Sequence, residues 1–229
     1  MHPGAMPDRR SAARDLARRA LARGEPMGWF EELYAAARDG SVSVPWADLA
    51  PSPELLTWLE RARPLLDGRR VCVVGCAYGD DAAHLAGLGA SVVAFDCAPT
   101  AIERAAERFG DSGVEWLAAE LLHLPEHLRL GFDLVVEINT LQVLPADLRP
   151  AAAAAIAALV APGGQLFVAA RLRLPGEAEG LMPWPLLEQE LSAFEAAGLT
   201  AAQRTVLFDG EDPPVRRIIA EFERPNPTL

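Results

Sequence analysis

Residues 70–96, RVCVVGCAYGDDAAHLAGLGASVVAFD, decide the fold of the chain. They begin with an apolar run at 71–74, which is typical of a strand buried on both faces. A glycine-bearing turn at 75–79 leads into a helical segment, and a second apolar run ends at Asp96. The pattern predicts a βαβ unit with a small-residue turn after its first strand and a carboxylate after its second.

This arrangement favours a nucleoside-containing ligand. Glycine in the turn lets the backbone approach a bound molecule closely, because no side chain stands in the way. A single carboxylate at the end of the second strand, here Asp96, accepts hydrogen bonds from two vicinal ribose hydroxyls. The competing interpretation of Asp96 is a helix N-cap.

Composition narrows the class of protein. The chain has 229 residues and is 51% hydrophobic, which suits one α/β domain with an N-terminal appendage. Its net charge of −11 argues against nucleic acid as a partner, since phosphate binding needs a basic surface. All 21 basic residues are arginine, and the absence of lysine excludes Schiff-base and lysine-base chemistry.

Cysteine usage and hydropathy predict a cytoplasmic protein without a metal site. The three cysteines, Cys72, Cys76 and Cys97, form no CxxC pair and have no histidine cluster beside them. The longest apolar segment is too short and too alanine-rich to span a bilayer, and no secretory signal is visible. We therefore expect no membrane association.

Upstream of the βαβ unit the sequence predicts a helical arm. Residues 1–24 favour an amphipathic helix with Leu16, Ala20 and Leu21 on its apolar face, and a second helix carries Trp29 and Tyr34. Ser52 followed by Pro53 marks the start of another helix. We expect residues 1–56 to form an arm that covers a ligand, and residues 57–229 to form the main domain.

Downstream, strands and helices alternate. Further strands are expected at 114–117, 132–137, 165–171, 199–208 and 215–222, and further helices at 98–109, 146–160 and 186–197. Turn residues at 210–214 join the last two strands as an antiparallel hairpin. The fold class is α/β: a Rossmann-like, seven-stranded, mostly parallel sheet with helices on both faces and a C-terminal antiparallel hairpin.

In this order and spacing the motifs resemble those of the class I S-adenosylmethionine-dependent methyltransferases. The resemblance covers residues 70–171 and includes VGCAYG at 74–79, Asp96, Glu120 in AAELLHLP, FDLVVEINTLQVLP, and LVAPGGQLFV. It implies S-adenosylmethionine as methyl donor and S-adenosylhomocysteine as product, with no metal. Three departures alter contacts in detail: Val73 replaces an acid, Ala77 replaces the central glycine, and Glu120 replaces the commoner aspartate.

The resemblance also implies which residues bind the cofactor. Asp96 would hold the ribose, Glu120 the adenine amine and Leu121 the adenine ring, while Glu137 would face the sulfonium or the acceptor. The full expected set is Trp46, Gly75, Cys76, Ala77, Gly79, Asp81, Asp96, Cys97, Ala98, Glu120, Leu121 and Glu137. Glu120 as a solvated loop acid and Glu137 as a buried acid bonded to backbone amides are the competing interpretations.

A segment upstream is similar to the cover of the thiopurine and halide methyltransferase-like branch. It consists of Trp29, Tyr34, Pro45, Trp46, Pro51 and Pro53. In that branch the segment folds over the cofactor and its tryptophan approaches the methionyl end. This implies a small nucleophile as acceptor: a thiol, halide, amine or hydroxyl. Core packing remains the competing interpretation of both tryptophans.

Methyl transfer from a sulfonium is an in-line displacement, which depends on alignment and on exclusion of water. A general base is needed only if the nucleophile must lose a proton. The candidates at strand ends are Glu137, Thr140 and His123, with Arg171 and Arg173 as ligands for an anionic acceptor. Apolar residues at 181–184 favour an uncharged or aromatic acceptor.

The expected function is S-, N- or O-methylation of a small molecule by a monomer or homodimer. Two alternatives stay open at this point. One is a catalytically silent S-adenosylmethionine-binding protein, since no clear base is present. The other is a nicotinamide-dependent oxidoreductase, although Ala77 and Asp80 stand where its fingerprint needs glycine.

Overall fold

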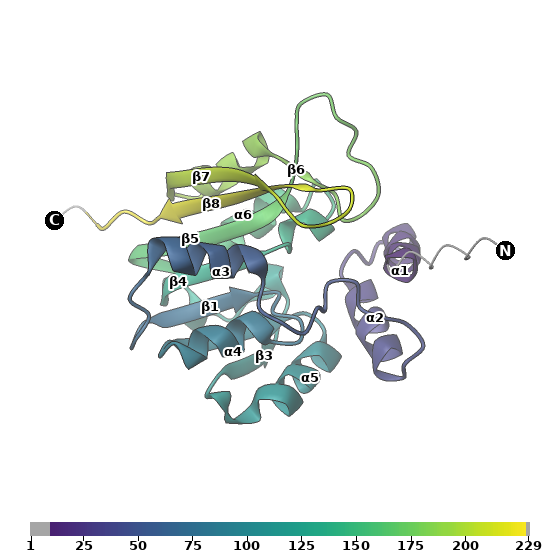
Figure 1. Ribbon diagram of the computed structural model, residues 1–229, viewed down its shortest axis with the longest axis horizontal. Coiled ribbons are helices and arrows are strands. Elements are labelled where there is room, and N and C mark those ends of the chain that lie inside the picture. The colour runs from purple at the N-terminus through teal and green to yellow at the C-terminus, as the bar shows by residue number, and fades with distance from the viewer. Residues whose placement is uncertain (1–9, 228–229) are drawn as a thin grey trace.

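The computed structural model describes residues 10–227, and one sheet forms its centre (Figure 1). Its strands are β1 (Arg70–Val74), β2 (Ser91–Asp96), β3 (Glu115–Ala118), β4 (Phe132–Ile138), β5 (Val160–Arg173), β6 (Leu186–Leu187), β7 (Thr200–Phe208) and β8 (Arg216–Glu223). They are ordered β3-β2-β1-β4-β5-β8-β7, and the short β6 pairs with β5 off this path. The five neighbouring strands β3, β2, β1, β4 and β5 are parallel, whereas β8 runs antiparallel to both β5 and β7. The predicted fold class is confirmed.

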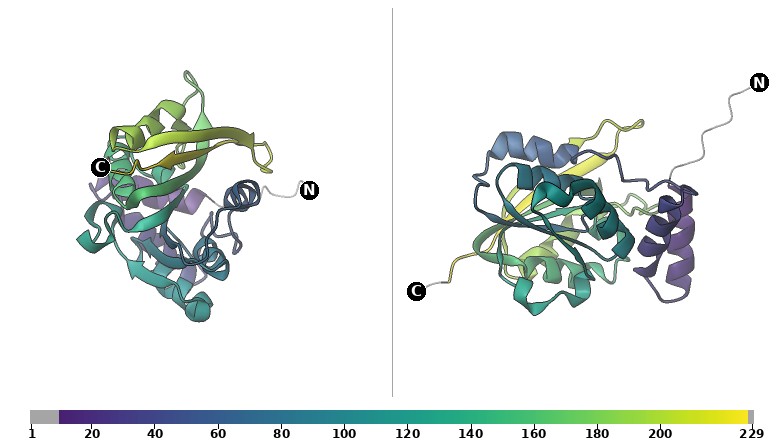
Figure 2. Two further views of the ribbon diagram at one scale, coloured as in Figure 1. Left: turned by 90° about the vertical axis from the view of Figure 1, so that its left-hand side faces the viewer. Right: turned by 90° about the horizontal axis from the view of Figure 1, so that it is seen from below.

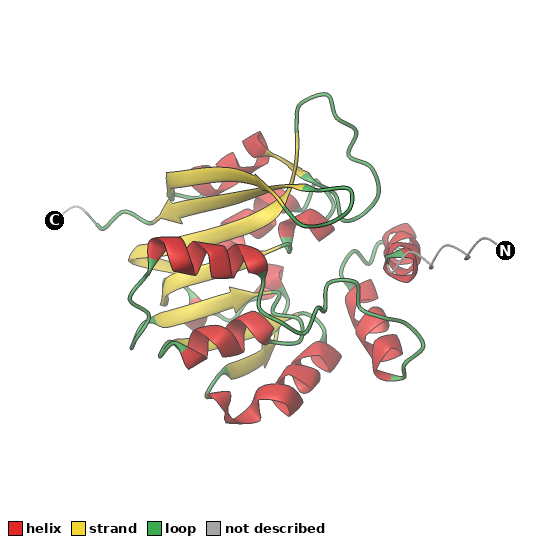
Figure 3. Cartoon of the chain, viewed as in Figure 1, coloured by secondary structure: helices red, strands yellow, loops and turns green. Residues whose placement is uncertain are grey.

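Helices cover both faces of the sheet, as the secondary-structure colouring of Figure 3 shows. They are α1 (Ser11–Ala22), α2 (Gly28–Arg38), α3 (Pro53–Ala62), α4 (Asp80–Gly87), α5 (Pro99–Phe109), α6 (Arg149–Ala157) and α7 (Ser192–Ala196). Short 3₁₀ turns are η1 (Gly110–Ser112), η2 (Leu121–His123), η3 (Glu126–Leu128), η4 (Leu141–Val143) and η5 (Glu188–Leu191).

The two faces of β1 show why the strand sequence is apolar throughout. Successive side chains point to opposite faces, so Cys72 and Val74 pack with α6 and α7. Val71 and Val73 pack on the other face, with α3, α4 and α5. Both layers are fully buried, which is the environment that a continuous hydrophobic run predicts.

Helices α1 and α2 form a separate layer at the carboxyl edge of the parallel strands. In Figure 1 the β1 arrow points toward them, and the right-hand view of Figure 2 shows them at one end of the domain. Trp29, Leu33 and Tyr34 are almost fully buried in this layer. The fully buried residues of α1 are alanines, Ala13, Ala17 and Ala20. Of the three predicted apolar positions, Ala20 is buried and Leu16 packs against the same layer, whereas Leu21 is 36% exposed.

Two predicted helices are wrong in extent because pairing across the sheet overrides local pattern. The helix expected at 146–160 is α6, which ends at Ala157, and Val160 already pairs with Phe132 as the start of β5. The helix expected at 186–197 begins as β6, because Leu186 pairs with Leu172 of β5. The 3₁₀ turn η5 and the short α7 make up the rest of that range.

The predicted arm at residues 1–56 contains α1, α2 and the start of α3. Ser52 caps α3 as predicted, since its hydroxyl accepts from the Leu55 N–H. α3 itself packs on the sheet through Leu55 and Trp58, so it is continuous with the main domain. The division at residue 56 stays a prediction, and residues 1–9 lie outside the described residues.

Candidate active site

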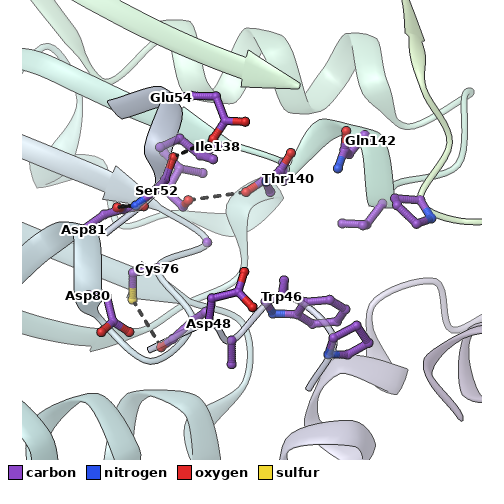
Figure 4. Close-up of a pocket in the computed structure, with 18 of the residues that line it drawn as sticks. Trp46, Asp48, Ser52, Glu54, Cys76, Asp80, Asp81, Ile138, Thr140 and Gln142 are labelled. Carbon is purple, nitrogen blue, oxygen red and sulfur yellow. Dashed lines mark hydrogen bonds between the residues drawn. The ribbon is translucent and has the colours of Figure 1, made fainter. Parts of the chain in front are cut away.

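A cavity of about 710 Å³ lies between the α1–α2 layer and the carboxyl ends of β1, β2 and β4 (Figure 4). This is the edge at which open α/β sheets bind ligands. The wall brings together residues predicted for the site and residues that were not: Trp46, Gly75, Cys76, Ala77, Asp81, Asp96, Cys97, Leu121, Thr140, Gln142, Arg171, Glu211 and Arg217.

The turn after β1 is held in a conformation that suits glycine. Gly75, Ala77 and Gly79 have φ values of 60°, 49° and 87°, in the left-handed region. A Cβ at Gly75 would lie 2.5 Å from the Thr140 hydroxyl, so glycine is required there for space as well. Ala77 occupies the position of the missing glycine and adopts the same strained region at a cost of about 1–2 kcal/mol.

Asp96 fastens this turn to the end of β2. Its carboxylate accepts from the Ala77 N–H at 3.0 Å and from the Ala98 N–H at 3.0 Å. Burial raises the pKa of Asp96, and the two amide hydrogen bonds oppose that rise. The N-cap of α5 is Ala98 rather than Asp96, so the carboxylate ties the turn to the residue before the helix instead of capping the helix, and it also lines the cavity.

On the adjacent wall, Asp81 joins the first turn of α4 to the start of α3. Its carboxylate accepts from the Ser52 N–H at 2.7 Å. Burial raises its pKa to about 6. Figure 4 shows Asp81 next to Ser52, with Glu54 beyond them. The wall at this point is therefore acidic, with Asp81 and Glu54, and the Ser52 N–H is already hydrogen-bonded to Asp81.

Trp46 lies on the cavity wall opposite the glycine turn. Its indole N–H donates to the Tyr34 hydroxyl at 2.8 Å, and its ring meets Tyr34 edge-on with centroids 6.1 Å apart. Trp29 and Phe30 complete the aromatic cluster behind it. Trp29 is core, being 1% exposed, whereas Trp46 is half-buried and presents part of its ring to the cavity.

The three predicted catalytic residues occupy different environments. Thr140 is on the wall, and its hydroxyl donates to the Val74 carbonyl at 3.3 Å. Glu137 is fully buried behind the wall, where one carboxylate oxygen accepts from the Thr140 and Leu141 N–H groups at 2.6 and 3.1 Å. Burial raises its pKa to about 7. His123 is 78% exposed and does not reach the cavity.

Glu120, which was predicted to bind the cofactor, does not line the cavity either. Its side chain is 58% exposed, and its carboxylate lies 3.1 Å from His123 Nδ1. Leu121, the next residue, is buried and lines the cavity. Gly79 and Ala98 support the wall from behind rather than lining it.

A cluster of arginines and acids at the cavity mouth was only partly foreseen. Arg171 lines the cavity as predicted and pairs with Glu211, whereas Arg173 turns away to the Pro185 carbonyl. Arg217 was missed, and it contacts Glu54 at 2.9 Å, among other acids. These partners come from segments that only the fold brings together.

The same cluster fastens the α1–α2 layer over the cavity. Arg10, at the start of α1, pairs with Glu211 at 3.0 Å in the turn between β7 and β8. Arg14 donates to the Met182 carbonyl at 2.8 Å in the segment after β5. The α1–α2 layer therefore contacts two separate loops of the main domain, and both loops line the cavity.

Within residues 10–227 no three His, Cys, Asp or Glu side chains are grouped as around a metal ion. None of the helices in the same range is long and apolar enough to cross a bilayer.

The fold and the cavity together define a Rossmann-like protein with a cavity at the carboxyl ends of its first βαβ unit. Residues 71–164 match the sequence model of a family described as a methyltransferase domain. The chain is 26% identical over 168 residues to the 2-heptyl-1-hydroxyquinolin-4(1H)-one methyltransferase of Mycobacteroides abscessus, covering 71% of this chain and 72% of that relative.

Two further likenesses agree. The ubiquinone biosynthesis O-methyltransferase of Bordetella avium is 32% identical over 128 residues; the match covers 55% of this chain and about half of that relative, 52%. The N-methyltransferase NodS from Bradyrhizobium japonicum, solved with S-adenosylhomocysteine, has the same fold, with a TM-score of 0.66 at 21% identity over 86% of this chain and 100% of NodS.

The matched domain, residues 71–164, is a methyltransferase domain, and the enzyme has the motifs of a class I S-adenosylmethionine-dependent methyltransferase, as the sequence predicted. Its methyl donor is S-adenosylmethionine. The absence of a side chain at Gly75 and the buried carboxylate of Asp96 fit a nucleoside at the ends of β1 and β2. This identification replaces the alternatives of a silent binding protein and a nicotinamide-dependent oxidoreductase. The thiopurine and halide branch stays a prediction, because none of these likenesses specifies it.

Proposed function

We propose that this enzyme methylates an acidic hydroxyl on a small, largely apolar, planar molecule. The observation that carries the proposal is a group of apolar residues on the cavity wall. They are Met27, Phe30, Val143, Met182 and Pro183, the first four of which belong to one apolar cluster, and the polar Gln142 and Arg171 line the same cavity. An apolar wall with a few polar groups favours a small aromatic acceptor. Met182 and Pro183 belong to the apolar segment from which an aromatic acceptor was predicted.

The cofactor would occupy the other half of the cavity. Asp96 would accept from the ribose hydroxyls through its remaining lone pairs, and Leu121 would pack on the adenine ring. The residues at 75–77, with Asp81 and Cys97, would surround the ribose and the methionyl chain. Glu120 would reach the adenine amine only if its side chain turned away from His123. Trp46 would close the methionyl end.

The methyl group would pass by in-line displacement from the sulfonium to the acceptor oxygen. The contribution of the chain is to align the two and to exclude water, and the α1–α2 layer over the entrance supports that role. Among the predicted catalytic residues only Thr140 lies on the wall, and its hydroxyl proton is engaged with Val74. A hydroxyl acidic enough to ionise in water needs no dedicated base, so we favour that class.

The names of two relatives support an oxygen acceptor. One acts on a hydroxyquinolone and the other is an O-methyltransferase of ubiquinone biosynthesis. A 1-hydroxyquinolin-4-one combines a planar ring, an apolar chain and an acidic N-hydroxyl. We therefore use 2-heptyl-1-hydroxyquinolin-4(1H)-one, here called the hydroxyquinolone probe, as a representative of the class.

The test is a methyl-transfer assay on the full chain with S-adenosylmethionine. The hydroxyquinolone probe is compared with an aromatic thiol and an aromatic amine of similar size, and products are identified by mass spectrometry. We expect a methylated hydroxyquinolone together with S-adenosylhomocysteine. Methylation of the thiol or the amine in preference to the hydroxyl would refute the proposed acceptor class. Faster turnover of the thiol would instead favour the thiopurine-like branch.

A further inference from the structure

Gln142 occupies an unusual position in the acceptor half of the cavity. It lies in η4, directly after the turn that follows β4, and its side chain is only 3% exposed. It nevertheless lines the cavity. In Figure 4 its nitrogen is drawn on the side of Trp46 and its oxygen on the side away from it.

Two hydrogen bonds fix the orientation of this amide. The Gln142 side-chain oxygen accepts from the Arg171 N–H of β5 at 2.7 Å. Its main-chain carbonyl accepts from the Trp184 N–H, also at 2.7 Å. Because the Arg171 N–H can only donate, the atom facing it must be the amide oxygen. The NH₂ group is thereby directed away from β5.

That NH₂ group has no hydrogen-bond partner among residues 10–227. It is also absent from the fully enclosed unpartnered atoms of that range, which are the indole nitrogens of Trp58 and Trp116 and one oxygen of Glu137. The amide nitrogen thus reaches open space in the cavity. A donor held rigidly among Met182, Pro183 and Val143 is costly to leave unpaired, by about 1–3 kcal/mol.

We propose that Gln142 is a specificity-determining residue whose side-chain NH₂ group binds an oxygen of the methyl acceptor. The acceptor class is a planar molecule carrying a carbonyl or ionised hydroxyl oxygen, and the inference rests on the proposed function above. A neutral donor in an apolar recess selects an oxygen acceptor over an analogue that lacks it, because the analogue leaves the donor unpaired. The same contact favours the ionised form of a hydroxyl over its protonated form.

The alternative is that Gln142 only braces β5 and the segment before β6. Gln142→Glu separates the two roles. The substituted side chain is nearly isosteric and retains an oxygen for the Arg171 N–H, but it replaces the donor with a second acceptor. Gln203→Glu is the matched control, since Gln203 is exposed on β7 and makes the same change in charge away from the cavity.

The experiment measures binding to the S-adenosylhomocysteine-loaded full chain by calorimetry. The probes are the hydroxyquinolone probe and the parent heptyl-substituted quinoline, which lacks both oxygens. We expect wild type and Gln203→Glu to prefer the oxygenated probe by at least about tenfold, which is about 1.4 kcal/mol. We expect Gln142→Glu to lose or reverse that preference while its affinity for S-adenosylhomocysteine changes less than about twofold. Should that variant not fold, Gln142→Met, which has no donor, is measured in its place.

Three results would overturn the inference, and only the last of them concerns the proposed function as well. Equal binding of both probes by wild type, or an unchanged preference in the Gln142 variant, refutes the donor role and leaves the proposed function standing. If wild type binds S-adenosylhomocysteine but neither probe, the proposed acceptor class itself is refuted, and the inference is refuted with it.

Discussion

The two halves of the cavity are built in different ways. The half that we propose for the cofactor comes mostly from one continuous stretch, residues 75–97, in which Cys76 N–H donates to the Phe95 carbonyl and Ala77 N–H to Asp96. The acceptor half is assembled from side chains on segments far apart in sequence, such as Phe30, Gln142 and Met182. The shape of the first half is set by backbone conformation, and that of the second by which side chains line it. A site shaped by the backbone tolerates few substitutions, whereas substitutions in a site shaped by side chains can change its specificity and leave the fold intact.

The largest effect should come from adding one methyl group to the backbone-defined half. Gly75→Ala places a Cβ 2.5 Å from the Thr140 hydroxyl at a φ of 60°. Left-handed strain and overpacking together cost about 4 kcal/mol, so S-adenosylhomocysteine should bind about a thousandfold more weakly by calorimetry. Gly40→Ala is the control, because Gly40 has a φ of +74° with open space around it. A folded Gly75→Ala chain with nearly normal affinity would break the comparison.

The second effect concerns Glu137, which lies where the two halves meet and fixes the turn carrying Thr140. Its pKa is about 7 in the folded chain against an ordinary 4.5, so between these values the folded state holds more protons than the unfolded state. The free energy of unfolding should therefore fall as pH rises through this window, by up to about 3 kcal/mol from this group. Glu137→Gln should lack that part of the fall.

The measurement for Glu137 is denaturant unfolding of both chains at several pH values. Subtracting the two curves removes the contribution of Asp81, whose raised pKa of about 6 is present in both. Parallel curves for wild type and Glu137→Gln between pH 4.5 and pH 7 would show that Glu137 does not titrate in this way.

The smallest of the three effects is expected at Asp96. Asp96→Ala removes the proposed ribose ligand and leaves the Ala77 and Ala98 N–H groups without their acceptor. We expect S-adenosylhomocysteine to bind at least about tenfold more weakly, about 1.4 kcal/mol, the scale of one charge-assisted hydrogen bond. Asp111→Ala, an exposed acid in η1, serves as the control. Unchanged affinity in a folded Asp96→Ala chain would refute the ribose role.

The same contrast explains how much the sequence could predict. Gly75, Asp96 and the βαβ unit that carries them follow from local pattern, because a βαβ unit encloses its own ligand edge. Trp46 was placed correctly on the cavity wall from its position between proline and aspartate in an irregular segment. Glu120 and His123 were predicted for the site but do not line the cavity. Only the fold shows that their side chains pair with each other in solvent.

Residues that depend on long-range pairing could not be read from the sequence. Gln142 became visible as a donor only once the Arg171 N–H was seen to fix its oxygen. Arg217 and Glu211 meet at the cavity mouth because the C-terminal hairpin folds back beside β5. A helical period at 186–197 likewise gave no sign that Leu186 would pair as a strand.

The indole of Trp46 gives the enzyme a built-in optical reporter. Its ring borders the cavity and its N–H is held by Tyr34, whereas Trp29 and Trp58 are sealed in the core. Trp116 and Trp184 are half-buried and do not line the cavity. A ligand entering the cavity therefore changes the polarity chiefly around Trp46, so that changes in tryptophan emission on titration report occupancy in real time without any label.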